Sequence, residues 1–189
     1  MTQDYFRFYG KKSVMILKVN FAKKNGSLEI APAIDENRDM KGPASKGSNI
    51  YDYKNARYFS IAPAEAAKLL VDLAVLERNP EEKVDPLYHD RSKSDKVEGN
   101  DVTTLNVGKW KDNRGILKTT INIYSREDKQ SRNYLLHTPA DLLMFKSFLN
   151  VIIKDVVMLG LYHEFINRPE RETKYNSPES GSGAPPAPF

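Results

Sequence analysis

The stretch Tyr58-Phe59-Ser60-Ile61-Ala62-Pro63-Ala64-Glu65 decides the fold, because it joins an aromatic-rich strand to the start of a helix. A proline suits the first helical turn, where its missing N–H costs nothing, and an acid two residues later lies near the positive end of the helix dipole. The same phrase returns as Tyr134-Leu135-Leu136-His137-Thr138-Pro139-Ala140-Asp141. Each copy therefore predicts a strand that runs directly into a helix.

Strand-like runs precede each copy, so the chain is expected to form two units of strands followed by a helix. In the first unit we expect strands over residues 5–9, 13–21, 28–34 and 51–61, a turn at 23–26, a long loop at 35–50 and a helix over 63–78. In the second unit we expect strands near 87–90 and over 102–110, 116–125 and 132–137, then a long helix from 139. Thr138 and Asp141 match a capping box for that second helix.

Length and composition bound the protein class. A chain of 189 residues with 40% hydrophobic content can bury a real core. We expect one domain over residues 1–166 and a flexible Ser/Pro/Gly-rich tail over 167–189. The absence of cysteine excludes disulfides and thiolate sites, and no signal, transit or membrane segment is visible, so we expect a cytoplasmic protein without membrane contact.

Positive charge is concentrated at the N-terminal end of the chain. The net charge is only +4, yet residues 1–60 hold 11 Lys or Arg and six acids. Such an asymmetry is typical of a surface that meets a polyanion.

Alternation along the predicted strands indicates what the sheets present to solvent. One helix covers only one face of its sheet, so the other face meets water or a ligand. Cations on that face hold phosphates and planar rings stack on unpaired bases, which points to single-stranded nucleic acid. The candidate contact residues are Tyr5, Arg7, Tyr9, Lys18, Tyr51, Tyr53, Lys54, Arg57, Trp110, Lys118 and Tyr124.

Several segments share a resemblance to one known family. Phe8-Tyr9-Gly10-Lys11-Lys12-Ser13-Val14-Met15 is similar to the lysine-glycine-lysine-alanine-alanine-leucine motif of the Whirly family of single-stranded DNA-binding proteins. Residues 51–54 and 59–65 resemble its tyrosine-aspartate-tryptophan segment and the helix start that follows. Residues 30–34 and 88–90 are similar to two further family segments, in the same order, and the resemblance covers about residues 5–160.

The resemblance implies an α+β fold of two ββββα units, about residues 1–78 and 87–166, each a four-stranded antiparallel sheet followed by a helix. It also implies a homo-oligomer, a tetramer in Whirly members, that binds single-stranded DNA with little sequence preference in replication, recombination or repair. Lys11 and Lys12 fall in the family's basic, DNA-binding motif, and Tyr53 falls at its tryptophan position. The glycine and lysine of the motif are transposed, so we expect a viral or bacterial relative of the fold.

The C-terminal end has a second resemblance. Pro188-Phe189 matches the ending of bacterial single-stranded DNA-binding proteins, whose tails recruit replication and repair enzymes. Those tips are acidic, and Glu179 is the only acid near this end. Partner recruitment and an inert tail both stay open as interpretations.

Other functions stay open beside single-stranded DNA binding. An RNA-binding protein or transcription cofactor of the same fold uses the same surface chemistry, and a purely structural oligomer needs only the long apolar helix. A nuclease would use His89-Asp90 or a metal held by Asp35, Glu36 and Asp39. The three histidines lack metal-ligand spacing, so we expect no enzyme, no metal and no cofactor.

Overall fold

The computed structural model of the protein describes residues 2–34, 50–90, 102–127, 129–156, 158 and 161. The first half consists of β1 (Thr2–Tyr9), β2 (Ser13–Asn20), β3 (Asn25–Pro32), the 3₁₀ turn η1 (Tyr53–Asn55), β4 (Arg57–Ile61) and α1 (Pro63–Arg78). The second half consists of β5 (Leu87–Asp90), β6 (Val102–Lys111), β7 (Leu117–Ser125), β8 (Gln130–Leu136), α2 (Pro139–Val151) and the π-helical turn η2 (Ile152–Val156).

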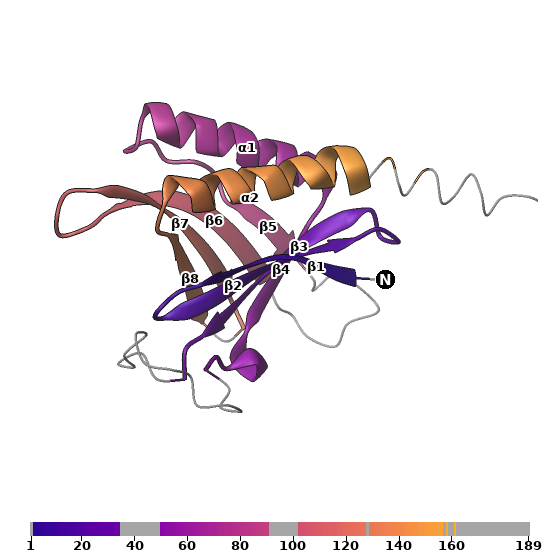
Figure 1. Cartoon of the computed structure of the whole chain (residues 1–189), viewed down its shortest axis with the longest axis horizontal. Helices are drawn as coiled ribbons and strands as arrows, with labels where there is room; N and C mark the ends of the chain where they lie inside the picture. The colour runs from indigo at the N-terminus through magenta and orange to yellow at the C-terminus, as the bar shows by residue number, and fades with distance from the viewer. Residues whose placement is uncertain are drawn as a thin grey trace, which may run out of the picture.

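Both sheets are antiparallel meanders, with strand orders β1-β2-β3-β4 and β5-β6-β7-β8. The predicted α+β fold of two ββββα units is therefore confirmed. In Figure 1 the two sheets lie across one another, and α1 and α2 lie side by side on the same side of the molecule.

One hydrophobic core serves both halves. It combines Met15, Leu17, Leu28, Ile30 and Phe59 of the first sheet with Leu105, Ile121, Ile123 and Tyr134 of the second. The helices add Leu69 and Leu73 from α1, and Phe145, Phe148 and Ile152 from α2 and η2. We call the face of each sheet that contributes to this core its inner face, and the opposite face its outer face.

The two helix starts are stabilised as the repeated phrase predicts. At α2, Thr138 Oγ1 accepts from the Asp141 amide (3.1 Å) and Asp141 Oδ2 accepts from the Thr138 amide (2.9 Å). At α1, where Ala62 has no capping oxygen, Glu65 Oε2 accepts from the Ala62 amide at 2.8 Å. The predicted capping box at α2 is thus present, and α1 has half of one.

Glu65 also joins the two halves of the chain. Its Oε1 lies 2.7 Å from His89 Nε2 on β5, and the His89 ring stacks on Phe59 with centroids 4.1 Å apart. Burial alone would raise the pKa of Glu65, but hydrogen bonds from His89 and the Ala62 amide hold it below its ordinary value of 4.5. The ionised carboxylate therefore stabilises the folded state.

This geometry predicts an acid-sensitive stability. Because the folded pKa of Glu65 is depressed, its contribution is present above the unfolded value of 4.5 and is lost as pH falls through the lower folded value. As the pH falls from 4.5 to the folded pKa, we expect the free energy of unfolding of Glu65→Gln, measured by urea titration at several pH values, to fall less steeply than that of wild type. An identical slope for both proteins would show that the pair contributes nothing.

Two local predictions were wrong. The strand predicted over 51–61 begins only at Arg57, because Asp52 Oδ1 accepts from the Lys54 and Asn55 amides and closes the turn η1. The turn predicted at 23–26 is at 21–24 instead, so Gly26 lies inside β3. Lys24, the last residue of this turn, takes the left-handed conformation, with φ 50°. A Cβ at Gly26 would overlap the Ile152 side chain, so this glycine serves packing between β3 and η2.

Two further predictions fall on residues beyond the described ones. These are the loop predicted over 35–50, of which only Ile50 is described, and the tail over 167–189. Within the described part of the chain, no helix is both long and apolar enough to cross a membrane.

Candidate nucleic-acid interface

The outer face of the second sheet is open to solvent over most of its described rows. Strand register places each residue on this face beside its partners on the neighbouring strands, and all of them are at least partly exposed except Val102, which pairs with Asp90 at one end of the sheet and is 7% exposed. The two largest exposed rings are those of Tyr88 (56% exposed) and Trp110 (47% exposed). The face consists of Tyr88, Asp90, Val102, Thr104, Asn106, Gly108, Trp110, Lys118, Thr120, Asn122, Tyr124, Ser131, Asn133 and Leu135.

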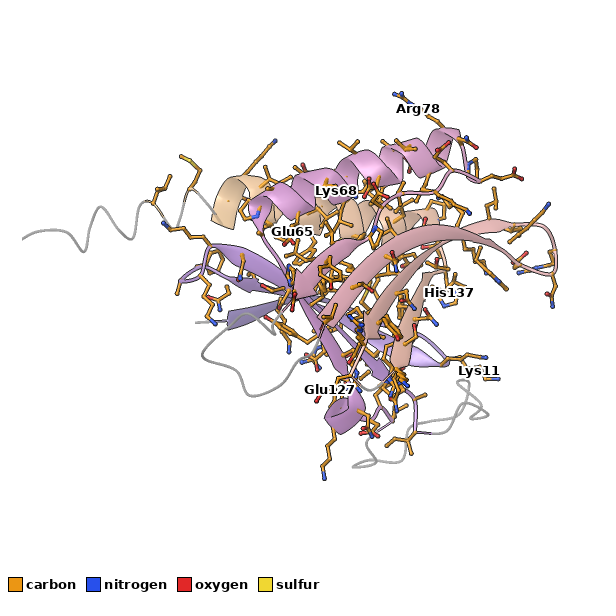
Figure 2. The ribbon with its side chains drawn as sticks, turned by 180° about the vertical axis from the view of Figure 1, so that it is seen from behind. Lys11, Glu65, Lys68, Arg78, Glu127 and His137 are labelled. Atoms are coloured by element: carbon orange, nitrogen blue, oxygen red, sulfur yellow. The ribbon has the colours of Figure 1, made fainter. Side chains whose placement is uncertain are left out.

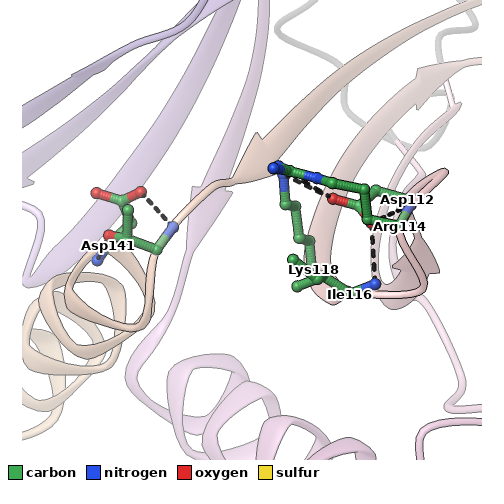
Figure 3. Close-up of polar contacts among 6 residues, drawn as sticks. Asp112, Arg114, Ile116, Lys118 and Asp141 are labelled. Atoms are coloured by element: carbon green, nitrogen blue, oxygen red, sulfur yellow. Dashed lines mark hydrogen bonds and ion pairs between the residues drawn. The ribbon is translucent and has the colours of Figure 1, made fainter.

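A rigid hairpin holds Trp110 beside a cation. Trp110 pairs with Lys118 across β6 and β7. Asp112 Oδ1 accepts from the Arg114 and Ile116 amides (3.0 and 2.9 Å), and Oδ2 lies 3.4 Å from Lys118 Nζ (Figure 3). The Ile116 amide, the Arg114 amide and Lys118 hold the pKa of Asp112 below its usual value. The ring and ammonium predicted as DNA contacts thus share one end of this face.

A row of side-chain amides crosses the middle of the same face. Asn106, Asn122 and Asn133 are directly opposite one another on β6, β7 and β8. Asn122 Nδ2 donates to Ser131 Oγ and to Asn133 Oδ1. Neutral amides offer both donors and acceptors, which suit the edges of unpaired bases. We call these three residues the amide row.

The outer face of the first sheet is partly covered, contrary to the prediction of a bare face. Val14, Ile16 and Ala31 point outward, but they are buried beneath Tyr51 and the neighbouring Ile50 and Ala56. Tyr51 is only 4% exposed, and its hydroxyl donates to the Gly10 carbonyl at 2.9 Å. The prediction that Tyr51 presents a ring to a base is therefore wrong, because the apolar outward residues of β2 and β3 need a cover.

Two exposed tyrosine rings pack against the ring of Tyr51. The ring centroids of Tyr9 (59% exposed) and Tyr53 (41% exposed) lie 6.1 and 6.5 Å from that of Tyr51. We call Tyr9, Tyr51 and Tyr53 the tyrosine cluster. Lys11, Lys12 and Lys54 are exposed on the adjoining β1–β2 connection and η1. In Figure 2 Lys11 lies in the lower part of the view, whereas Arg78 of α1 lies at its top.

The remaining side chains predicted to contact DNA differ in their exposure to solvent. Arg7 is exposed, and Tyr124 is half-buried on the outer face of the second sheet. Lys18 is half-buried and forms an ion pair with Glu29. Arg57 is opposite the core residue Ile30, so it lies on the inner face, against the prediction of an outward side chain. Alternation counted from buried Phe59 gives that result directly.

Three predicted residues lie outside what the structure describes. The backbone of Tyr5 belongs to β1, but its side chain is outside the described part, as are Pro188 and Phe189. Their roles stay predictions.

Sequence reasoning missed two exposed tyrosines and the amide row. Tyr58 is 45% exposed on the outer face of β4, and Tyr88 is 56% exposed on β5. Tyr58 alternates with the buried Phe59 and Ile61, a signal already present in the quoted strand. The amide row depends on register across three strands, which no local pattern reveals.

The fold has a counterpart among solved structures. The structure of the plant transcriptional regulator PBF-2 superposes with a TM-score of 0.50 at 16% sequence identity, covering 87% of this chain and 96% of that chain. This similarity supports the Whirly-like fold. No protein-family model and no curated protein sequence matches the chain.

Proposed function

We propose that the protein binds single-stranded DNA with little sequence preference, through the outer face of its second sheet and the tyrosine cluster with its lysines. The observation that carries this proposal is the uncovered outer face, where Trp110, Tyr88 and Lys118 accompany the amide row. Stacking on aromatic rings requires unpaired bases, because a duplex hides its base faces. Covering exposed single strands is a task common to replication, recombination and repair, where we propose it acts.

We propose binding rather than catalysis. His89, on which the acid–base form of the nuclease hypothesis depends, is engaged by Glu65 and stacked on Phe59. These contacts give it a role in joining β5 to α1. The metal ligands of the other form of this hypothesis, Asp35, Glu36 and Asp39, lie outside the described residues.

A competition assay tests the proposed function. We expect a labelled oligo-dT to be displaced by unlabelled single-stranded DNA and far less well by duplex DNA, with affinity falling steeply between low and moderate salt. Single-stranded RNA of the same length is the third competitor, since stacking surfaces accept either sugar. Stronger competition by RNA would make this an RNA-binding protein, and equal competition by duplex would contradict stacking on unpaired bases.

Removing the lysines beside the tyrosine cluster is expected to weaken binding to all sequences alike. Phosphate contacts carry no base information, and each one lost from a single strand lowers the salt slope by about 0.7. The triple variant Lys11→Ala, Lys12→Ala, Lys54→Ala should therefore reduce the slope of log K against log salt by about 2. Replacing Lys23, Lys129 and Lys154, which are exposed elsewhere, provides the charge-matched control. Equal slopes for both triple variants would remove this region from the interface.

We also propose that the protein is a homo-oligomer, with four copies as the working assembly. Both helices carry exposed apolar side chains, among them Val71 (63% exposed) on α1 and Leu143 (65% exposed) on α2. Because contiguous exposed apolar surface favours association, Val71→Asp should lower the mass measured by light scattering. Lys68→Ala, on the same helix, is the control. A monomeric wild-type protein would contradict this proposal without affecting DNA binding by one copy.

A further inference from the structure

Gly108 lies in the middle of β6 without a structural need for glycine. Pairing with β7 runs without interruption from Thr103 to Lys111, so there is no bulge at this position. A Cβ built on Gly108 would meet a single neighbour, Thr120 Oγ1, at an ordinary contact distance of 3.4 Å. Its φ is not positive, since the only glycine with positive φ in the described chain is Gly115.

The other described glycines differ from it. A Cβ at Gly26 would overlap Ile152, one at Gly10 would lie 2.9 Å from the Ser13 carbonyl oxygen, and Gly115 has a φ of 81°. Each of these is explained by the folded chain itself. Glycine within a strand weakens it, and it often marks a place where a ligand approaches the backbone closely.

The space over Gly108 has walls suited to a nucleobase. Asn106 and Trp110 flank it along β6 on the same outer face, and Thr120 lies beside it on β7. Leu135 on β8 is opposite Thr120 and is the next residue of the same row. The space is therefore bounded by an aromatic ring, an amide and a hydroxyl. We call it the Gly108 notch.

On its remaining side the notch reaches the free edge of β6, where a groove begins. The groove extends on the inner side of the sheet, to which Val107, Lys109 and Lys111 of its lining belong. β5 pairs with β6 only as far as Leu105, and beyond it the link 79–84 runs past Asn106 and Gly108. The groove between them encloses about 880 Å³, within the range of ligand sites, and Lys83, Lys109 and Lys111 contribute to its lining together with Glu81 and Glu82. Lys83 and Lys111 are exposed, whereas Lys109 is half-buried and donates to Thr119 Oγ1 at 2.9 Å, so Lys83 and Lys111 are the lysines more accessible to a phosphate.

We propose that the Gly108 notch seats one unpaired base of the bound strand. The base lies on the bare backbone at Gly108 and packs against Trp110, and its edge meets Thr120 and Asn106. Its phosphate lies over the free edge of β6, at the opening of the groove that Lys111 lines. This proposal rests on the proposed function and adds a defined base site to it. A polypeptide strand added to β6 would lie in the plane of the sheet, and would gain nothing from a missing side chain on the outer face.

The test compares wild type, Gly108→Ala and Gly108→Val in binding to an oligo-dT and to an abasic oligomer of the same length. We expect both substitutions to lower oligo-dT affinity, Gly108→Val by at least about fivefold, with abasic affinity unchanged. Ala22→Val, which adds two methyl groups at an exposed position in the turn between β2 and β3, is the control and should bind both oligomers as wild type does.

The variants should fold, because alanine and valine have higher strand propensity than glycine and only Thr120 lies near the new Cβ. A melting temperature at or above that of wild type verifies folding. If Gly108→Val does not fold, Gly108→Ala provides the test. An unchanged ratio of oligo-dT to abasic affinity in a folded Gly108 variant would overturn the notch and leave the proposed function standing. Failure of wild type to bind oligo-dT would overturn both.

Discussion

Replacing Trp110 with alanine is expected to weaken binding to oligo-dT by about 1–3 kcal/mol, or roughly 5- to 150-fold. The ring is 47% exposed on the outer face of the second sheet, beside Lys118 and the Gly108 notch. It is thus available to a base, and its removal takes away the largest stacking surface on that face. Fluorescence anisotropy of a labelled oligonucleotide measures the loss.

Two control variants sharpen this prediction. Trp110→Phe keeps a planar ring and should retain most of the affinity, whereas Leu117→Ala removes an exposed apolar side chain from the opposite face of the same hairpin. Equal binding by Trp110→Ala and wild type would place the bound strand away from this end of the second sheet.

Replacing Phe148 with alanine is expected to cost about 3–5 kcal/mol of folding free energy. Its ring is fully buried in the core that both halves share, 6.4 Å from Phe145, and it lies over Gly26 of β3. Because the core is shared, the loss should lower the urea midpoint of one common transition.

Circular dichroism and Trp110 emission together measure that transition. The two signals should change at the same urea concentration in wild type and in Phe148→Ala, and Phe148→Leu should lose less stability. Separate transitions, with the Trp110 signal unchanged by the substitution, would show that the halves fold independently.

Local sequence chemistry was sufficient for the helices and for the second sheet. Pro63 and Pro139 begin α1 and α2, and Thr138 with Asp141 forms the expected capping box. In β7 the strict alternation of Ile121 and Ile123 with polar neighbours assigned the inner and outer faces correctly. These features depend on residues close in sequence, where periodicity and capping act directly.

The first sheet was harder to predict because its outer face depends on distant contacts. Val14 and Ile16 are apolar and point to the outer face of β2, so a bare outer face would expose them to water. Alternation within the strand does not reveal which residue covers them. Their cover, Tyr51, follows a long stretch of chain, and its burial rests on a hydrogen bond to Gly10 across 41 positions. The availability of Tyr9 and Tyr53 likewise depends on that tertiary contact.

The most direct test of the account uses Trp110, the only tryptophan in the chain, as an internal reporter. Titration of the wild-type protein with oligo-dT at low salt should change the Trp110 emission in a saturable manner, with an affinity equal to that from anisotropy. Added salt should reverse the change, and duplex DNA should produce little of it. Tight binding of oligo-dT with no change in Trp110 emission would contradict the claim that an unpaired strand lies on the outer face of the second sheet.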